Sequence, residues 1–159
     1  MPNYKGHLIA GAVTFAATLY TLNHFGTPMP STETMALFLL VTLVGSIFPD
    51  IDTKSKMQKY FYVSSAFIFP ALLFTRTLNY VFLIAGLCIA IPCLRHRTIT
   101  HNPFFILGLP GLMALYAVLF YPSTQQLVLF CYIFFVCGAL SHIFLDRLFT
   151  RIKKIFLLR

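Results

Sequence analysis

Long apolar stretches, each close to the length of a membrane span and nearly free of charge, recur along the chain. A helix needs about 20 mostly apolar residues to cross the hydrocarbon core of a bilayer. Stretches of this kind lie at about residues 7–25, 34–48, 60–74, 77–94, 103–121 and 125–149. They predict an all-α, polytopic membrane protein of about six transmembrane helices. Residues 1–159 would form one domain that ends in a basic tail at about residues 147–159.

The composition argues against a soluble protein and against nucleic-acid binding. Charged residues make up 10% of the chain, and hydrophobic residues 58%. A soluble domain carries roughly 25% charged residues, so this chain could not cover its surface in water. The net charge of +8 is not arranged as a basic surface with interleaved aromatic residues, so membrane lipids, and not nucleic acids, are the expected partners. The four cysteines lie in apolar stretches without a CxxC pair, which predicts no thiolate zinc site.

The positive charges predict the orientation in the membrane. With the N-terminus in the cytoplasm, all but one of the twelve Lys and Arg residues fall on the cytoplasmic side, and only Arg76 falls outside. Basic residues near the ends of membrane spans favour the cytoplasm. The pattern therefore predicts that both termini are cytoplasmic, with an even number of crossings between Lys59 and Arg95.

Most of the acidic residues and histidines gather at one predicted membrane face. Three of the four acids and four of the five histidines fall at the cytoplasmic ends of helices, namely Asp50, Asp52, Asp146, His7, His96, His101 and His142. Ionisable groups at membrane depth are costly and mark a functional site by default. Glu33 and His24 fall on the other side, and no role is expected for them.

The local spacing of these residues favours a metal site. His142 and Asp146 are four residues apart, so on a helix they share a face and can bind one metal, or the aspartate can orient the imidazole. Pro49 should end the second helix and let Asp50 and Asp52 turn towards a shared point. Mixed imidazole and carboxylate ligands suit zinc, manganese or iron, whereas calcium and magnesium favour oxygen ligands.

Four motifs follow one another in a recognisable order: His7, then Pro49-Asp50-Ile51-Asp52, then the segment from His96 to His101 with the sequence HRTITH, and then the segment from Ser141 to Asp146 with the sequence SHIFLD. Over nearly its whole length the chain resembles the membrane-bound metal-dependent hydrolases, which include LexA-regulated inner-membrane proteins of bacteria. The resemblance implies a multi-pass protein of the bacterial inner membrane with a metal-dependent hydrolase site.

The favoured function is a metal-dependent hydrolase that faces the cytoplasm. Its metal ligands would come from His7, Asp50, His101, His142 and Asp146, and the ion, zinc first with manganese or iron as alternatives, would lower the pKa of bound water. Asp52 or His96 would act as the general base or support a ligand. Arg97 would stabilise developing negative charge. The depth of the site suggests a lipid-like substrate with a phosphate or acyl ester.

Other interpretations stay open. Each of these polar residues also has an ordinary structural explanation, such as a helix end, an interfacial basic loop or a hydrogen bond between helices. A divalent-metal or proton-coupled transporter is one alternative, although the apolar stretches carry almost no charge at the bilayer midplane. A non-enzymatic membrane adaptor, in which the histidines and aspartates only stabilise helix packing, is another.

Overall fold

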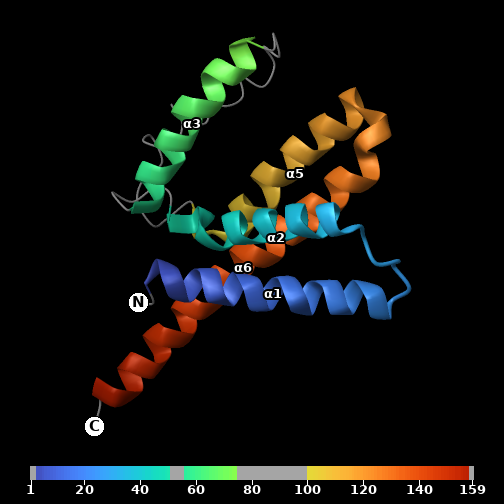
Figure 1. Ribbon diagram of the computed structural model, residues 1–159. Helices are drawn as coiled ribbons and strands as arrows, with labels where there is room; N and C mark the ends of the chain where they lie inside the picture. Colours follow the sequence, from blue (N-terminus) through green and yellow to red (C-terminus); the bar gives the residue numbers. More distant parts are fainter. Residues whose placement is uncertain (1–2, 51–55, 75–99, 158–159) are drawn as a thin grey trace. The chain divides into compact units, whose positions relative to one another are not determined.

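The computed structural model describes residues 3–50, 56–74 and 100–157 of the chain. These residues form five α-helices and two short 3-10 turns, with no strand among them (Figure 1). The α-helices are α1 (Tyr4–His24), α2 (Thr32–Ile47), α3 (Lys56–Phe74), α5 (Pro103–Phe120) and α6 (Gln125–Leu157). The predicted all-α class is confirmed, and the predicted helix at residues 77–94 lies outside the described residues.

The chain divides into two compact units. The first unit combines residues 1–49 with residues 101–159 and contains α1, α2, α5 and α6. The second unit, residues 50–100, contains α3. All contacts described below lie within the first unit.

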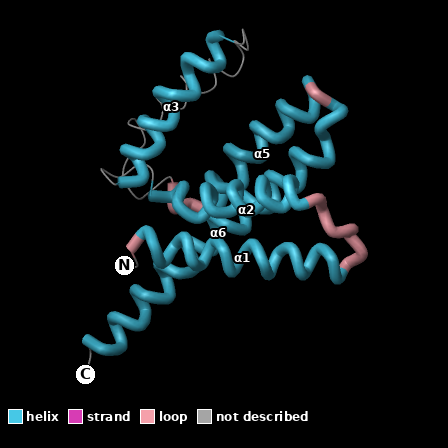
Figure 2. The backbone as a smooth tube through the Cα atoms, viewed as in Figure 1, coloured by secondary structure: helices cyan, strands magenta, loops and turns pink. Residues whose placement is uncertain are grey.

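Local signals fix where helix α1 begins and ends. Asn3 caps α1, its side chain accepting a hydrogen bond from the backbone N–H of Gly6 at 3.1 Å. The helix ends at His24, and two residues later Gly26 has a φ of +86°, which is easily reached only without a Cβ atom. The N–H of Gly26 donates to the carbonyl of Asn23 and that of Thr27 to the carbonyl of Leu22, which is the Schellman arrangement. Figure 2 shows the loop that then leads into α2.

Helices α2 and α6 touch through two glycines. A Cβ atom added to Gly138 would collide with the carbonyl oxygen of Thr42, and one added to Gly45 would collide with the carbonyl oxygen of Phe135. Between apolar helices in a membrane, such small residues allow the backbones to approach closely and gain van der Waals contact. Gly11 places α1 beside the same point, since its Cβ would lie 2.7 Å from Oγ of Ser46. The bundle of α1, α2 and α6 is therefore tightest around Ser46 and Gly138.

Helix α5 packs against α6 as a hairpin. The 3-10 turn η2 (Pro122–Thr124) joins the two helices. The hydroxyl of Tyr132 donates to the carbonyl of Leu107 at 3.1 Å, which links α6 to the turn of α5 before Pro110. A proline inside a helix removes the backbone donor for the carbonyl four residues earlier, which for Pro110 is the carbonyl of Ile106. Helix α5 nevertheless continues through Pro110 to Phe120.

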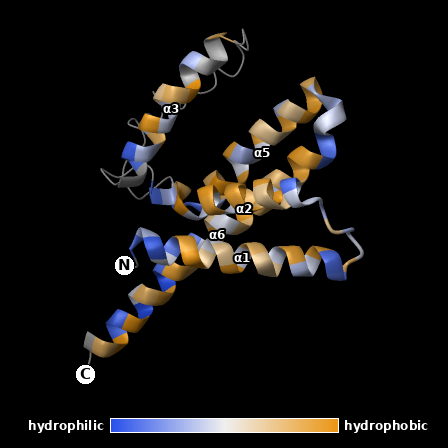
Figure 3. Cartoon of the chain, viewed as in Figure 1, coloured by the Kyte–Doolittle hydropathy of each residue, from blue (hydrophilic) through white to orange (hydrophobic). Residues whose placement is uncertain are grey.

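Within the described residues, three helical segments are long and apolar enough to cross a membrane: Thr32–Asp50, Pro103–Phe120 and Pro122–Phe156. Figure 3 shows how largely apolar these helices are. Many of their large apolar side chains point outwards, as Phe104 does with 83% of its surface exposed. Helix α1 has 21 residues, but Lys5 and His7 near its start and Asn23 and His24 at its end make it less apolar, and it is not among the three.

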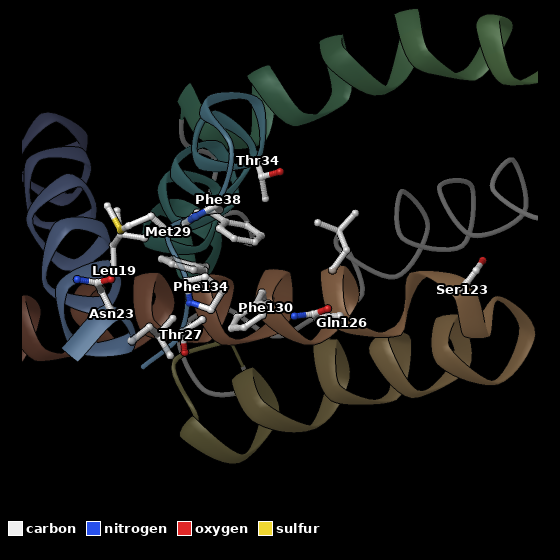
Figure 4. Close-up of a pocket in the computed structure, with 14 residues that line it drawn as sticks. Leu19, Asn23, Thr27, Met29, Thr34, Phe38, Ser123, Gln126, Phe130 and Phe134 are labelled. Carbon is white, nitrogen blue, oxygen red and sulfur yellow. The ribbon is translucent and has the colours of Figure 1, made fainter. Parts of the chain in front are cut away.

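The end of the bundle near the α1–α2 loop holds a cavity of about 370 Å³ (Figure 4). Its lining includes the aromatic rings of Phe38, Phe130 and Phe134 and the polar groups of Asn23 and Gln126. The rings of Phe38 and Phe134 stack with their centroids 4.7 Å apart. All the residues that line this cavity are uncharged.

Candidate metal centre

Three histidines approach one buried aspartate at the opposite end of the bundle. Nε2 of His7 lies 3.5 Å from Oδ1 of Asp146, and the Nε2 atoms of His101 and His142 lie 3.7 and 3.6 Å from Oδ2. Only 12% of the Asp146 side chain is exposed, and His7 and His142 are almost fully buried. The four residues come from widely separated parts of the chain, so tertiary packing creates this cluster.

Local features of the helices position the histidines and the aspartate of the cluster. His7 follows the Asn3 cap by one helical turn, so it lies on the bundle side of the first turns of α1. His142 and Asp146 lie one turn apart on α6. His101 directly precedes Asn102, whose side chain caps α5 by accepting from the N–H of Phe104 at 2.9 Å. Pro103 then fills the first helical position, which fixes the backbone immediately after His101.

The imidazole rings pack on one another. The rings of His7 and His142 stack with centroids 3.8 Å apart and planes inclined by 16°. The ring of His101 meets that of His142 edge-on, with centroids 5.4 Å apart and planes at 71°. The stacking and the three approaches to Asp146 turn the ring nitrogens towards a common volume beside the carboxylate.

A backbone carbonyl orients His142. Its Nδ1 lies 2.8 Å from the carbonyl oxygen of Ser46 on α2. Because a carbonyl oxygen only accepts hydrogen bonds, Nδ1 must carry the proton in this contact. In the neutral ring the lone pair is then on Nε2, on the side of Asp146. Histidines that bind metals commonly donate their second N–H to a carbonyl in this way.

One oxygen of the Asp146 carboxylate, Oδ1, lacks a hydrogen-bond donor in the described part of the chain. A buried carboxylate is stable only when it is paired, hydrogen-bonded or bound to a metal. The histidine nitrogens at 3.5–3.7 Å are beyond the usual hydrogen-bond range of about 2.7–3.2 Å. The spacing therefore leaves a place for a cation between nitrogen and oxygen.

These residues fit a divalent metal ion. One nitrogen or oxygen atom each from His101, His142 and Asp146 lies within 4.8 Å of the others. Two tetrahedral ligands at zinc distances of 2.0–2.1 Å stand roughly 3.4 Å apart, close to the nitrogen–oxygen separations found here. Mixed nitrogen and oxygen ligands suit zinc, manganese and iron, and the geometry does not distinguish among them.

The structure places the predicted site residues in different regions. The structure brings His7, His101, His142 and Asp146 together, and their roles as ligands stay predictions. Asp50 ends the 3-10 turn η1 (Phe48–Asp50) after α2, is half-buried, and belongs to the second unit. Asp52, His96 and Arg97 lie outside the described residues. His24 and Glu33, for which no role was predicted, are exposed, and His24 is about 25 Å along α1 from His7.

Sequence reasoning missed the groups that hold the cluster in place. The carbonyl of Ser46 is a backbone atom, so no side-chain pattern announces it. The close contacts of Gly11 and Gly138 were also missed. One signal was present: Gly11 follows His7 by four residues, and Gly138 precedes His142 by four. A small residue one turn from a histidine, on the same helical face, marks a close helix contact that can bury the ring.

A comparison with protein families identifies the family of this chain. The chain has no significant match among curated proteins or among solved structures. The family model described as YdjM inner membrane protein matches residues 1–156, which is nearly the entire chain. The earlier resemblance and the multi-pass inner-membrane location are thereby confirmed. The chain belongs to the YdjM inner membrane protein family, the LexA-regulated membrane-bound metal-dependent hydrolases.

Proposed function

We propose that this protein hydrolyses a lipid-like phosphate or acyl ester at the cytoplasmic face of the inner membrane, with a metal held by the His/Asp cluster. The observation that carries the proposal is the approach of three histidine Nε2 atoms to the buried carboxylate of Asp146. Membership of a metal-dependent hydrolase family supports the same function. Zinc is the proposed ion because the cluster is small and mixes nitrogen with oxygen ligands.

The proposal includes a topology of six spans with both termini in the cytoplasm. Three of these spans correspond to helical segments long and apolar enough to cross a membrane. Helix α1, helix α3 and residues 77–94 would supply the other three. The distribution of Lys and Arg supports this orientation, because only Arg76 would face outwards.

The depth of the cluster supports a lipid-like substrate. A span of about 20 residues that starts at Gln125 ends near Phe144, so Asp146 lies at the membrane boundary. A site at this depth can accept the ester of an amphiphile while its hydrocarbon part stays in the bilayer. A freely soluble substrate would instead have to reach a mostly buried carboxylate.

In the proposed mechanism the chain orients the reacting groups. A divalent cation supplies Lewis acidity and lowers the pKa of the water that contacts it. Ser46 holds the tautomer of His142 through its carbonyl oxygen. His7 packs over His142 and limits the rotation of its ring. Asp50 is proposed as a further ligand, Asp52 or His96 as the group that accepts a proton, and Arg97 as the group that stabilises negative charge.

Metal content tests the proposal directly. Full-length protein purified in mild detergent should contain bound metal by inductively coupled plasma mass spectrometry, and Asp146→Asn and His142→Ala should lose most of it. His24→Ala is the matched control, because His24 is an exposed histidine on α1 outside the cluster. Unchanged metal content in both cluster variants would refute the metal site. Metal that is present, together with uptake of that metal into proteoliposomes, would favour the transporter instead.

A further inference from the structure

Helix α6 continues well beyond the length that a membrane span requires. Its 33 residues extend for about 50 Å, whereas the hydrocarbon core of a bilayer is about 30 Å thick. If the span begins at Gln125, residues 147–157 therefore lie beyond the length needed to cross the membrane. These residues are called here the C-terminal extension. Figure 1 shows this end of α6 separating from α1 and α2. The predicted basic tail is thus an ordered helix through Leu157.

The C-terminal extension has two chemically different sides. At 3.6 residues per turn, one side carries apolar residues that begin in the preceding turn, and the other side carries cations. The apolar side contains Phe144, Leu148, Phe149, Ile152, Ile155 and Phe156. The cationic side contains Arg147, Arg151, Lys153 and Lys154. In Figure 3 the two kinds of residue alternate along this end of α6.

The apolar side is not covered within the bundle. Phe144, Ile155 and Phe156 expose 68%, 65% and 74% of their surfaces. An isolated exposed apolar residue needs no explanation, but a continuous apolar side on a helix that leaves its bundle requires a partner. Each square ångström of apolar surface removed from water contributes about 25 cal/mol, so covering several such side chains is strongly favourable.

The charges distinguish between two ways of covering this side. A second copy of the helix would bring two sets of four cations close together, and the only acid on α6, Asp146, lies within the cluster. An anionic membrane surface accepts both sides at once, with the apolar residues among acyl chains and the cations at the phosphates. Each Lys or Arg near such a surface contributes about 1 kcal/mol. In α6 the extension directly follows residues 125–144, which are enough to cross the hydrocarbon core.

We infer that the C-terminal extension is an interfacial helix that binds anionic phospholipid headgroups beside the His/Asp cluster. Lys153 follows Asp146 by seven residues, or two helical turns, so both lie on one face of α6. Headgroups held by the extension are therefore concentrated at the membrane boundary where the cluster lies. The lipid binding itself does not depend on the metal. The further step, that the ester at the cluster belongs to an anionic phospholipid, rests on the proposed hydrolase function.

A tryptophan scan tests the depth of the extension, because the natural chain contains no tryptophan. Phe156→Trp places the reporter on the apolar side, and Thr150→Trp places it on the polar side while keeping all four cations. Both full-length variants are reconstituted into vesicles of phosphatidylglycerol and phosphatidylcholine with brominated acyl chains. The bromines should quench Phe156→Trp several-fold more strongly than Thr150→Trp. Equal quenching of the two, or quenching of both by aqueous iodide alone, would overturn the inference.

A charge-matched pair of variants tests the headgroup. Native mass spectrometry measures the ratio of phosphatidylglycerol to phosphatidylcholine that the protein retains. Lys153→Gln combined with Lys154→Gln should lower this ratio several-fold. Lys5→Gln combined with Lys59→Gln removes the same charge from exposed lysines outside the extension and should lower the ratio less than the first pair does. The inference would be overturned if the first variant kept the wild-type ratio. It would also be overturned if the wild-type protein formed a dimer that this variant could not form. Metal content should be normal in both, which separates this test from that of the metal centre.

Discussion

At one end of the bundle of α1, α2 and α6, helices in close contact enclose histidines and an aspartate; at the other end, the same helices surround an uncharged cavity. The α2–α6 contact explains the difference. Gly138 and Phe134 lie four residues apart on one face of α6 and both pack towards α2. Where the residue is glycine, the backbones touch; where it is phenylalanine, they are held apart.

This difference determines which chemistry each end can support. Close backbones allow the Ser46 carbonyl on α2 to reach the ring of His142 on α6 at 2.8 Å. Separated backbones leave a cavity that is lined by phenylalanine rings and by neutral polar groups such as Asn23 and Gln126 (Figure 4). His142 follows Phe134 by eight residues, so about 12 Å separates the two environments along α6. The bundle thus buries histidines and an aspartate at one end, whereas Glu33 and His24 at the other end are exposed.

The largest expected effect is at the cavity end. Phe134 is fully buried and stacks on Phe38, so Phe134→Ala should lower the free energy of unfolding by about 3 kcal/mol. Thermal unfolding of the protein in detergent measures this loss. The metal content of the folded fraction should stay normal, because the residue lies about 12 Å from the cluster. Loss of metal from the folded fraction would show that the two ends are coupled.

The glycine contact should couple stability to the metal site. Gly138→Ala forces α2 and α6 apart, since the new Cβ atom would collide with the carbonyl oxygen of Thr42. We expect a loss of roughly 1–3 kcal/mol in unfolding free energy and a weaker affinity for metal, because Ser46 moves away from His142. Gly108→Ala is the matched control, since no atom lies within 4 Å of the added Cβ. Equal effects of the two substitutions would contradict the importance of the contact.

Much of the fold follows from the sequence. Apolar stretches of span length predicted the five α-helices that the structure describes. The pairing of His142 with Asp146 follows from their spacing of four residues. The stacking of His7 on His142 does not follow, because it depends on how α1 is rotated about its own axis. That rotation is set by contacts between helices, such as Gly11 against Ser46, and the spacing of Gly11 from His7 does not identify the partner residue on α2. The sequence predicted a basic tail in place of the C-terminal extension, because its charged residues lower the mean hydropathy of the segment.

A smaller and more selective effect is expected at His101. Its side chain is 19% exposed and lies at the edge of the cluster, so His101→Ala should leave the unfolding temperature nearly unchanged. Removing a metal ligand or its support commonly lowers affinity by about 10–100-fold. Competition with a chromogenic chelator measures this affinity. A wild-type affinity would remove His101 from the ligand set and leave His7, His142 and Asp146 as the described candidates.

The smallest effect concerns the cap that precedes α5. Asn102 accepts a hydrogen bond from the N–H of Phe104, and replacing such a cap with alanine costs about 1 kcal/mol. Because Asn102 directly follows His101, Asn102→Ala should also loosen the histidine and weaken metal binding by less than His101→Ala does. Asn102→Asp keeps the accepting oxygen and should restore both properties. If Asn102→Ala lowers stability without changing the affinity for metal, the cap stabilises α5 but does not position His101.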